Sequence, residues 1–384
     1  MDTGIRRAMT TQTDAHAAIR ELRGALAQPN LSLVLFFCSG TYDLAALSAE
    51  LRRAFPGVLV VGCTSAGQYG PGGWSEYGMA AVSFSGAVVT AVAGSHDDLA
   101  CFTRADGHAL AGRLQYELYT RLPSARAEHT FALLLTDGLS QREELVARSC
   151  KESLGSIRMF GGAAGDSLRA EQTMVFGNGR FRAGAAILLL AHSALPFRVF
   201  KTAHLAPTGE RWVITQADPA RRIVYEINGL PAADEFARLA GISAAELAPR
   251  HFAAASLAVT IGGQVYIRAL QKVNPDKSVT FQCAIEEGVV LRVTEGRHLA
   301  ENLHETLAQI AAQIGPPALL LNCDCVMRQM EIADKHLEQA VYPFLEHANA
   351  LGFNTYGEIY DGIYINQTLT GIAFGYPSQE ADHG

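Results

Sequence analysis

The chain has 384 residues, a length that is typical of a protein with two domains. Hydrophobic residues make up 49% of the sequence and charged residues 18%, so the composition supports a sizeable core and excludes an intrinsically disordered chain. The net charge is −7, and basic doublets such as Arg6-Arg7 and Arg221-Arg222 are isolated. We therefore expect no binding to nucleic acid, which needs clustered Lys and Arg.

The sequence indicates a cytoplasmic protein without a membrane span. Its longest apolar run, residues 183–190, has the length of a strand and is too short to cross a bilayer. The N-terminal residues do not follow a secretory pattern. Seven scattered cysteines, an odd number, suit free thiols in a reducing compartment better than a disulfide framework.

In the first half of the chain, short apolar runs alternate with amphipathic helical patterns, which predicts a largely buried sheet covered by helices. Two hairpins are also expected, one from residues 78–85 and 87–93 and one around Asn178-Gly179. The predicted helices cover residues 14–28, 42–55, 104–121 and 141–153, and the predicted strands cover residues 31–38, 58–63, 131–135 and 159–165.

The second half continues the mixed pattern. A helix is predicted from Pro231, because proline suits the first helical position, and hairpins are predicted around residues 274–276 and at the C-terminus. Further helices are expected over residues 295–314 and 329–351, and strands over residues 197–204, 212–216, 222–227, 289–293 and 318–323. We place the boundary after residue 195, which gives domains 1–195 and 196–384. The expected fold is mixed α/β, with two packed β-sheets and outer helices.

A glycine-rich segment follows the predicted strand over residues 58–63. Residues 62–68 resemble a phosphate-binding loop but lack its lysine, so we favour a tight turn of small residues. Cys63 would need a neighbouring base to act as a nucleophile, and the sequence marks none. Asp137 and Asp166 stand at strand ends, where an acid either takes part in chemistry or forms a turn, and we favour turns.

Three residues near position 325 have ligand chemistry. Cys323 and Cys325 stand one residue apart with no second pair, which is a weak zinc signal, whereas a single thiolate can bind haem iron. Arg328 can pair with a carboxylate or a haem propionate, or it can simply brace the following helix. The twelve histidines form no metal-binding pattern, but His204 ends an apolar strand near the domain junction. A histidine in this position is either structural or a ligand.

The stretch from residue 352 to 375 combines glycines, aromatic residues and uncharged polar residues. Side chains such as Tyr356, Glu358 and Asn366 supply hydrogen bonds at fixed points on an apolar wall, as in small-molecule pockets. The alternative is a pair of antiparallel strands whose polar residues bond to one another.

Several separated blocks of the sequence resemble the FIST domain family, in its N-terminal and C-terminal parts together. The resemblance extends over nearly the whole chain. These blocks are GCTSAGQ at 62–68, TDGLS at 136–140, FGGAAGD at 160–166, EINGLPAADEF at 226–236 and GFNTYGEIY at 352–360. Within that family the chain looks most like the nitric-oxide-sensing NosP branch, through FKTAHLAPT at 200–208, VITQADPARRIVYEING at 213–229, CDCVMR at 323–328 and INQTLTG at 365–371.

The resemblance implies a haem cofactor, sensing of nitric oxide or haem, and no enzymatic activity. It also implies a separate signalling partner, which would be a histidine kinase, or a diguanylate cyclase or phosphodiesterase of cyclic-di-GMP. NosP-like sequences often have a histidine where this chain has Tyr364, so His204 is the first choice as the iron ligand, followed by Tyr364 and Cys325. We keep a homodimer open.

Two alternatives remain. The chain could be a FIST sensor of another small molecule, such as an amino acid, without haem. It could also be an enzyme that uses Cys63, Cys325 or an aspartate, but no connected set of nucleophile, base and acid is visible.

Overall fold

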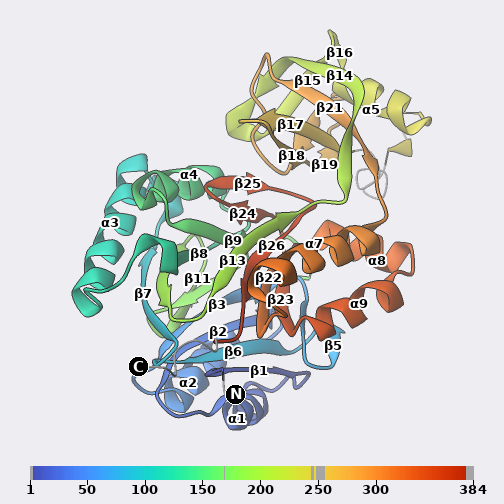
Figure 1. Ribbon diagram of the computed structural model, residues 1–384. Coiled ribbons are helices and arrows are strands. Elements are labelled where there is room, and N and C mark those ends of the chain that lie inside the picture. Colours follow the sequence, from blue (N-terminus) through green and yellow to red (C-terminus); the bar gives the residue numbers. More distant parts are fainter. Residues whose placement is uncertain (1–2, 168, 244–245, 248–255, 378–384) are drawn as a thin grey trace.

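The computed structural model describes residues 3–167, 169–243, 246–247 and 256–377. A large body carries a smaller inserted domain, residues 205–296, which the chain enters through strand β14 and leaves through strand β21 (Figure 1). Over the described residues, the body contains three sheets and the inserted domain contains one more. None of the described helices combines the length and apolar character that crossing a membrane requires.

The first sheet of the body has the strand order β1-β6-β2-β3-β10-β11. Helices α1 (Ala15–Leu26) and α2 (Leu44–Ala54) pack on its outer face, and each begins after an aspartate whose carboxylate accepts backbone N–H groups. Its strands are β1 (Ile5–Thr10), β2 (Leu31–Ser39), β3 (Leu59–Ser65), β6 (Met79–Ser85), β10 (Val175–Gly177) and β11 (Arg180–Arg182).

The second sheet has the order β25-β24-β9-β8-β12-β7. Helices α3 (Arg104–Arg121) and α4 (Glu143–Leu154) pack on its outer face. Its strands are β7 (Val89–His96), β8 (Thr130–Thr136), β9 (Arg158–Ala163), β12 (Ala186–Ser193), β24 (Glu358–Tyr360) and β25 (Ile363–Ile365), and two 3₁₀ turns lie nearby at Leu99–Cys101 and Ala127–His129.

The third sheet has the order β13-β26-β22-β23-β4-β5. Helices α7 (Leu299–Ile314), α8 (Val326–Asp334) and α9 (Glu338–His347) belong to its outer side (Figure 1). Its strands are β4 (Gln68–Gly70), β5 (Gly73–Ser75), β13 (Phe197–Thr202), β22 (Leu319–Cys325), β23 (Ala350–Thr355) and β26 (Leu369–Phe374).

The two halves of the sequence exchange strands. Strands β4 and β5 from the first half extend the third sheet, and the β24–β25 hairpin from the end of the chain extends the second sheet by pairing with β9. The inner faces of all three sheets meet in one core, where the Phe37 and Phe353 rings stack with centroids 4.2 Å apart. The expected domains 1–195 and 196–384 therefore interleave in the body.

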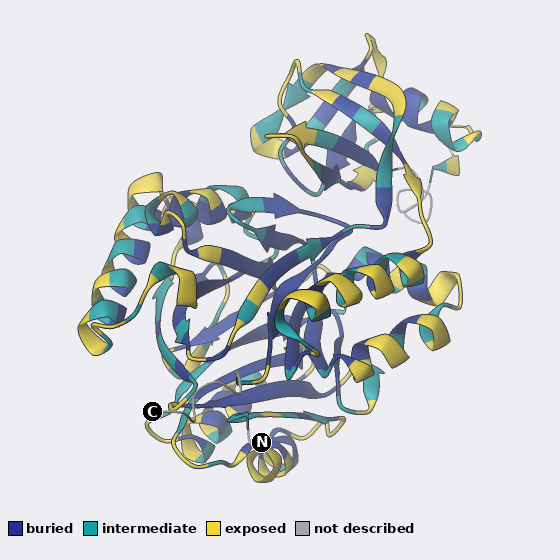
Figure 2. Ribbon diagram, in the orientation of Figure 1, coloured by how far each residue is buried: buried dark blue, intermediate teal, exposed yellow. Residues whose placement is uncertain are grey.

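The inserted domain is a curved antiparallel sheet whose strands alternate between buried and exposed residues, as Figure 2 shows. Helix α5 (Ala232–Ala240) closes its core, and the Trp212 and Phe236 rings meet edge to face at 4.9 Å. Along the order β18-β17-β21-β14-β15-β20-β19, with β16 beside β15, the strands are β14 (Leu205–Asp218), β15 (Ile223–Ile227), β16 (Leu230–Pro231), β17 (Leu257–Ile261), β18 (Gln264–Arg268), β19 (Leu270–Val273), β20 (Val279–Phe281) and β21 (Val290–Gly296), with a 3₁₀ turn at Pro219–Arg221.

The mixed α/β class with outer helices is confirmed, although the body has three sheets in place of two. The Asn178-Gly179 hairpin is also confirmed, since both residues have positive φ and join β10 to β11. The hairpin expected from residues 78–85 and 87–93 is wrong, because β6 pairs within the first sheet and β7 within the second. The helix expected over residues 329–351 is wrong too, because it breaks at His336, whose φ is +54°, and because residues 350–351 already belong to β23.

Candidate functional site

The glycine-rich loops of the first half meet the C-terminal stretch where the sheets join. The backbone N–H of Asn354 donates to the Gly67 carbonyl at 2.7 Å, and the backbone N–H of Gly165 donates to the Thr64 carbonyl at 3.1 Å. Gly67 has φ +147°, and a Cβ atom there would lie 2.8 Å from the Asn354 side-chain oxygen and from Trp74. The structure thus supports the tight-turn interpretation of residues 62–68, since this backbone serves contacts within the protein.

The turn interpretation of the two aspartates is confirmed. The Asp166 carboxylate accepts the backbone N–H groups of residues 170–172 at 2.7 to 2.8 Å, and it also accepts the Tyr356 hydroxyl. The Asp137 carboxylate accepts the Leu139 N–H at 2.9 Å and the Thr173 hydroxyl. Each acid therefore organises a loop, and Tyr356 ties the C-terminal stretch to one of them.

His204 lies fully buried at the point where the chain passes from the body to the inserted domain. Its Nε2 atom is 2.8 Å from the Glu331 carboxylate, and its Nδ1 atom is 3.1 Å from the Arg328 guanidinium. These contacts suit a neutral ring that donates from Nε2 and accepts at Nδ1. Burial lowers the pKa of His204, and the nearby Arg328 lowers it further, while the Glu331 hydrogen bond acts in the opposite direction.

Arg328 continues this buried network. Its Nε atom donates to the Asp324 carboxylate at 2.8 Å, and both side chains are almost fully buried. Burial raises the pKa of Asp324, and the Arg328 charge opposes that effect. Arg328 is thus a brace between helix α8, strand β22 and His204, which agrees with the alternative that the sequence left open.

On the opposite face of β22, Glu358 forms a second buried group. Its carboxylate accepts the Thr355 hydroxyl at 2.5 Å and both the N–H and the hydroxyl of Thr368 at 3.0 and 2.7 Å. Burial raises the pKa of Glu358 to about 8 against these hydrogen bonds. The Cys325 thiol is also buried, and burial followed by the Glu358 charge raises its pKa well above the usual range, so a thiolate is disfavoured. The buried Asn366 amide makes no hydrogen bond to the described residues.

Tyr364 belongs to a third group, which the sequence analysis missed. Its ring lies 5.8 Å from the guanidinium carbon of Arg222, and Arg222 donates to Glu143 at 2.5 Å and to Glu144 at 2.7 Å. Glu143 is fully buried at the start of α4, whereas Arg222 comes from the inserted domain. We call the contact of Arg222 with Glu143 and Glu144, which joins the inserted domain to the body, the latch. The Arg221-Arg222 doublet was the only sequence signal for it, and it gave no hint of the acidic partners.

The seven predicted site residues thus fall into separate groups. His204 and Arg328 are in contact, and Glu358 and Cys325 are neighbours. The Tyr364 hydroxyl donates to the Tyr356 carbonyl at 3.3 Å, and these two tyrosines also contact Arg222 and Asp166 respectively. Asn366 has no partner among the described residues. As arranged, these residues do not fit haem, because both ring nitrogens of His204 are engaged and the Cys325 thiol is held protonated. Within the described ranges, no three His, Cys, Asp or Glu side chains are grouped as metal ligands. Iron binding by His204 would require its ring to leave Glu331 or Arg328.

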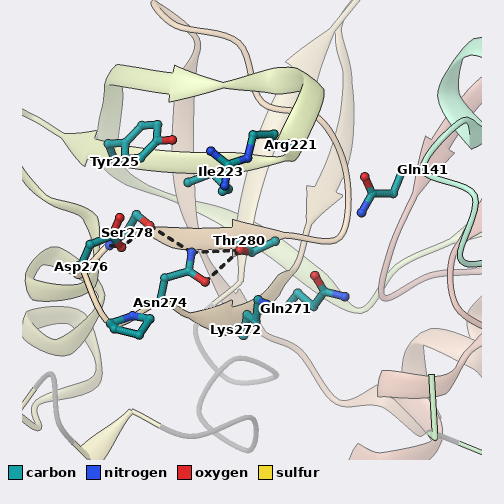
Figure 3. Close-up of a pocket in the computed structure, with 11 residues that line it drawn as sticks. Gln141, Arg221, Ile223, Tyr225, Gln271, Lys272, Asn274, Asp276, Ser278 and Thr280 are labelled. Carbon is teal, nitrogen blue, oxygen red and sulfur yellow. Dashed lines mark hydrogen bonds between the residues drawn. The ribbon is translucent and has the colours of Figure 1, made fainter. Parts of the chain in front are cut away.

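A cleft of about 590 Å³ lies on the inserted domain and faces the loop before α4 (Figure 3). Arg221 and Lys272 supply positive charge to its wall, Asp276 supplies negative charge, and Gln141 is the contribution of the body. The Asp276 carboxylate accepts the hydroxyl and the N–H of Ser278, and these hydrogen bonds lower the pKa of Asp276. The remaining lining residues are Ile223, Tyr225, Gln271, Asn274, Pro275, Ser278 and Thr280.

Comparison with known families gives two matches in chain order. The FIST N domain model matches residues 32–230, and the FIST C domain model matches residues 232–361. A comparison with curated proteins gives no match. The two models meet within the inserted domain, near the turn between β15 and α5. With more than half of its length matched and the two parts in order, the chain belongs to the FIST family of signal-transduction sensor domains.

Proposed function

We propose that this FIST protein senses a small zwitterion of the amino-acid type, which binds in the cleft of the inserted domain. The observation that carries the proposal is the charge arrangement of the cleft, where Arg221 and Lys272 line the same cavity as the ionised Asp276. An α-carboxylate pairs with a guanidinium or an ammonium group, and an α-ammonium pairs with a carboxylate. The volume of about 590 Å³ leaves room for a side chain beside Tyr225.

The position of the cleft supports a signalling role. Arg221 lines the cleft, while its neighbour Arg222 forms the latch with Glu143 and Glu144. Gln141, on the opposite wall, precedes α4, the helix that begins with these two acids. A ligand that bridges Arg221 and Gln141 would favour one placement of the inserted domain on the body, which is how binding shifts a two-state equilibrium. A separate signalling protein would recognise this state.

Calorimetric titration with a panel of free amino acids tests the ligand class. For any amino acid that binds, the analogues that lack the amine or the carboxylate should bind at least about tenfold more weakly, since each loses a charge-assisted hydrogen bond. The variants Arg221→Gln and Asp276→Asn should show the same loss. Arg211→Gln, which removes an exposed arginine of β14 outside the cleft, is the matched control. Absence of binding across the panel, or equal binding by all three variants, would overturn the proposal.

Haem is the alternative ligand, and the likeness to the NosP branch supports it. A NosP-like protein would use haem to detect nitric oxide and would act on a histidine kinase or on a diguanylate cyclase or phosphodiesterase. Haem requires apolar walls, a free axial ligand and cationic partners for its propionates. The contacts of His204 and Arg328 with Glu331 and Asp324 would have to be exchanged for contacts with haem.

A further inference from the structure

An apolar groove of about 510 Å³ runs along helices α7 and α9, away from the ligand cleft. Leu307, Ala308 and Ala311 contribute from α7, and Phe344 contributes from α9. The Phe344 side chain is 36% exposed and its ring rests on His304, with ring centroids 5.0 Å apart. An aromatic ring that stays exposed between two helices is typical of a surface that a partner covers.

The helices that form the groove are uniformly acidic. Neither the sequence of α7 nor that of α9 contains a Lys or Arg, while α7 carries Glu301 and Glu305 and α9 carries Glu338 and Glu346. The cation next to Glu346 is Arg7, which already donates to the Asn349 side chain at 2.7 Å and to the Ala350 carbonyl. Glu305 and Glu346 each stand next in sequence to a groove residue, His304 and His347, so negative charge borders the apolar floor, although no glutamate lines it. Glu305 also lines a separate cavity, to which Arg198 and Lys201 contribute.

We propose that this groove binds a basic amphipathic helix of a partner protein. The apolar face of such a helix would cover Phe344 and Leu307, and its Lys or Arg residues would lie along the glutamates. A helix of this kind satisfies its own backbone hydrogen bonds, so the groove needs to supply only apolar contacts and charge. The glutamates beside the groove would repel an anionic lipid surface, and they would also repel the propionates of haem.

The groove is connected to the inserted domain by the chain itself. Strand β21 leaves the inserted domain and leads into α7 within three residues. The Thr202 hydroxyl, at the end of β13, lies 2.8 Å from the side chains of Asn302 and Thr306 on α7. Strand β13, which leads to the inserted domain, and helix α7, which lines the groove, are thus joined by hydrogen bonds. The groove proposal does not depend on the ligand cleft, so it can be correct even when no amino acid binds in the cleft.

The test uses the full chain and a labelled synthetic peptide of roughly 18 residues, or five helical turns, with Leu on one face and Lys on the other. Fluorescence anisotropy should show saturable binding of this peptide, and at least tenfold weaker binding of the same peptide with Glu in place of Lys. Ala308→Trp, which fills the groove from an exposed position, should weaken binding at least tenfold. Ala333→Trp, at an exposed position of α8 outside the groove, is the matched control and should bind as the wild type does.

Charge variants separate the groove from the overall charge of −7. The triple change Glu301→Gln, Glu305→Gln and Glu346→Gln should weaken peptide binding, whereas Glu128→Gln, Glu171→Gln and Glu286→Gln, which remove the same charge from other exposed positions, should not. Equal binding by the two triple variants, or by the two Trp variants, would overturn the proposal. Ala308-dependent binding to vesicles of anionic lipid, or an Ala308-dependent dimer in sedimentation, would also overturn it in favour of another occupant.

Discussion

His204 Nε2 lies 2.8 Å from the Glu331 carboxylate, at the place where the chain leaves the body for the inserted domain. The His204 carbonyl also accepts the backbone N–H of Arg297 at 2.8 Å, so the outgoing and returning connections are joined at this residue. Although burial acts to raise it, the His204 and Lys335 contacts lower the pKa of Glu331 to about 2. The residue that the sequence singled out as an iron ligand therefore joins the two connections between the body and the inserted domain.

His204→Ala should lower the free energy of unfolding by about 2–4 kcal/mol, because it leaves the buried Arg328 and the largely buried Glu331 without this partner. Urea unfolding followed by circular dichroism measures the loss. His298→Ala, an exposed histidine at the start of α7 that makes no capping hydrogen bond, should change the stability by less than about 0.5 kcal/mol. Equal stabilities of the two variants would contradict a structural role for His204.

Glu358 should make stability fall as the pH rises. Its pKa is about 8 in the folded protein and 4.5 ordinarily, so the folded state binds more protons between these values than the unfolded state. The free energy of unfolding of the wild type, relative to Glu358→Gln, should therefore fall from pH 5 to pH 8 and stay constant above. The upper limit of the fall is about 4–5 kcal/mol, at roughly 1.4 kcal/mol per pKa unit. If the free energy of unfolding of the wild type relative to Glu358→Gln rises with pH, the three hydrogen bonds keep Glu358 ionised.

Removal of only one charged partner of the latch should lower the free energy of unfolding strongly. Arg222→Met leaves Glu143 buried without its cation and should destabilise the protein by about 3–5 kcal/mol. The double variant Arg222→Met with Glu143→Gln should recover at least half of that loss, since no buried charge remains. Chemical denaturation of the three proteins gives the comparison, and a double variant less stable than Arg222→Met would contradict the pairing.

Hydrogen exchange can show what the latch holds. Compared with the wild type, Arg222→Met should accelerate the exchange of amide protons in β15 and β20 more than in β2 and β8. The reason is that the latch joins the inserted domain to α4, whereas the core of the body does not depend on it. Uniform acceleration throughout the chain would mean that Arg222 stabilises the whole fold equally.

Addition of haem, with and without nitric oxide, tests the likeness to the NosP branch. A saturable Soret band at one haem per chain that shifts with nitric oxide would support the haem alternative. Because both ring nitrogens of His204 are bonded, we expect His204→Ala to leave the absorption spectrum unchanged. A band that is lost in His204→Ala and kept in His298→Ala would show that the ring leaves Glu331 to bind iron.

The sequence by itself determined the family, the mixed α/β class and most of the local elements. Strands such as β2 and helices such as α1 and α2 were predictable because their hydrophobic period and their capping residues are local properties of the chain. The roles of Asp137 and Asp166 were predictable for the same reason, since a carboxylate that organises a turn bonds to backbone groups nearby in sequence.

Only the tertiary structure decided which elements meet. The residue patterns of β6 and β7 predict strands, but no feature of either segment indicates that the two strands belong to different sheets. Likewise, Arg222 and Glu143 are 79 positions apart, and His204 and Glu331 are 127 positions apart. Partners at such separation are chosen by the packing of the three sheets and the insertion between β13 and α7, which no pattern within a single segment encodes.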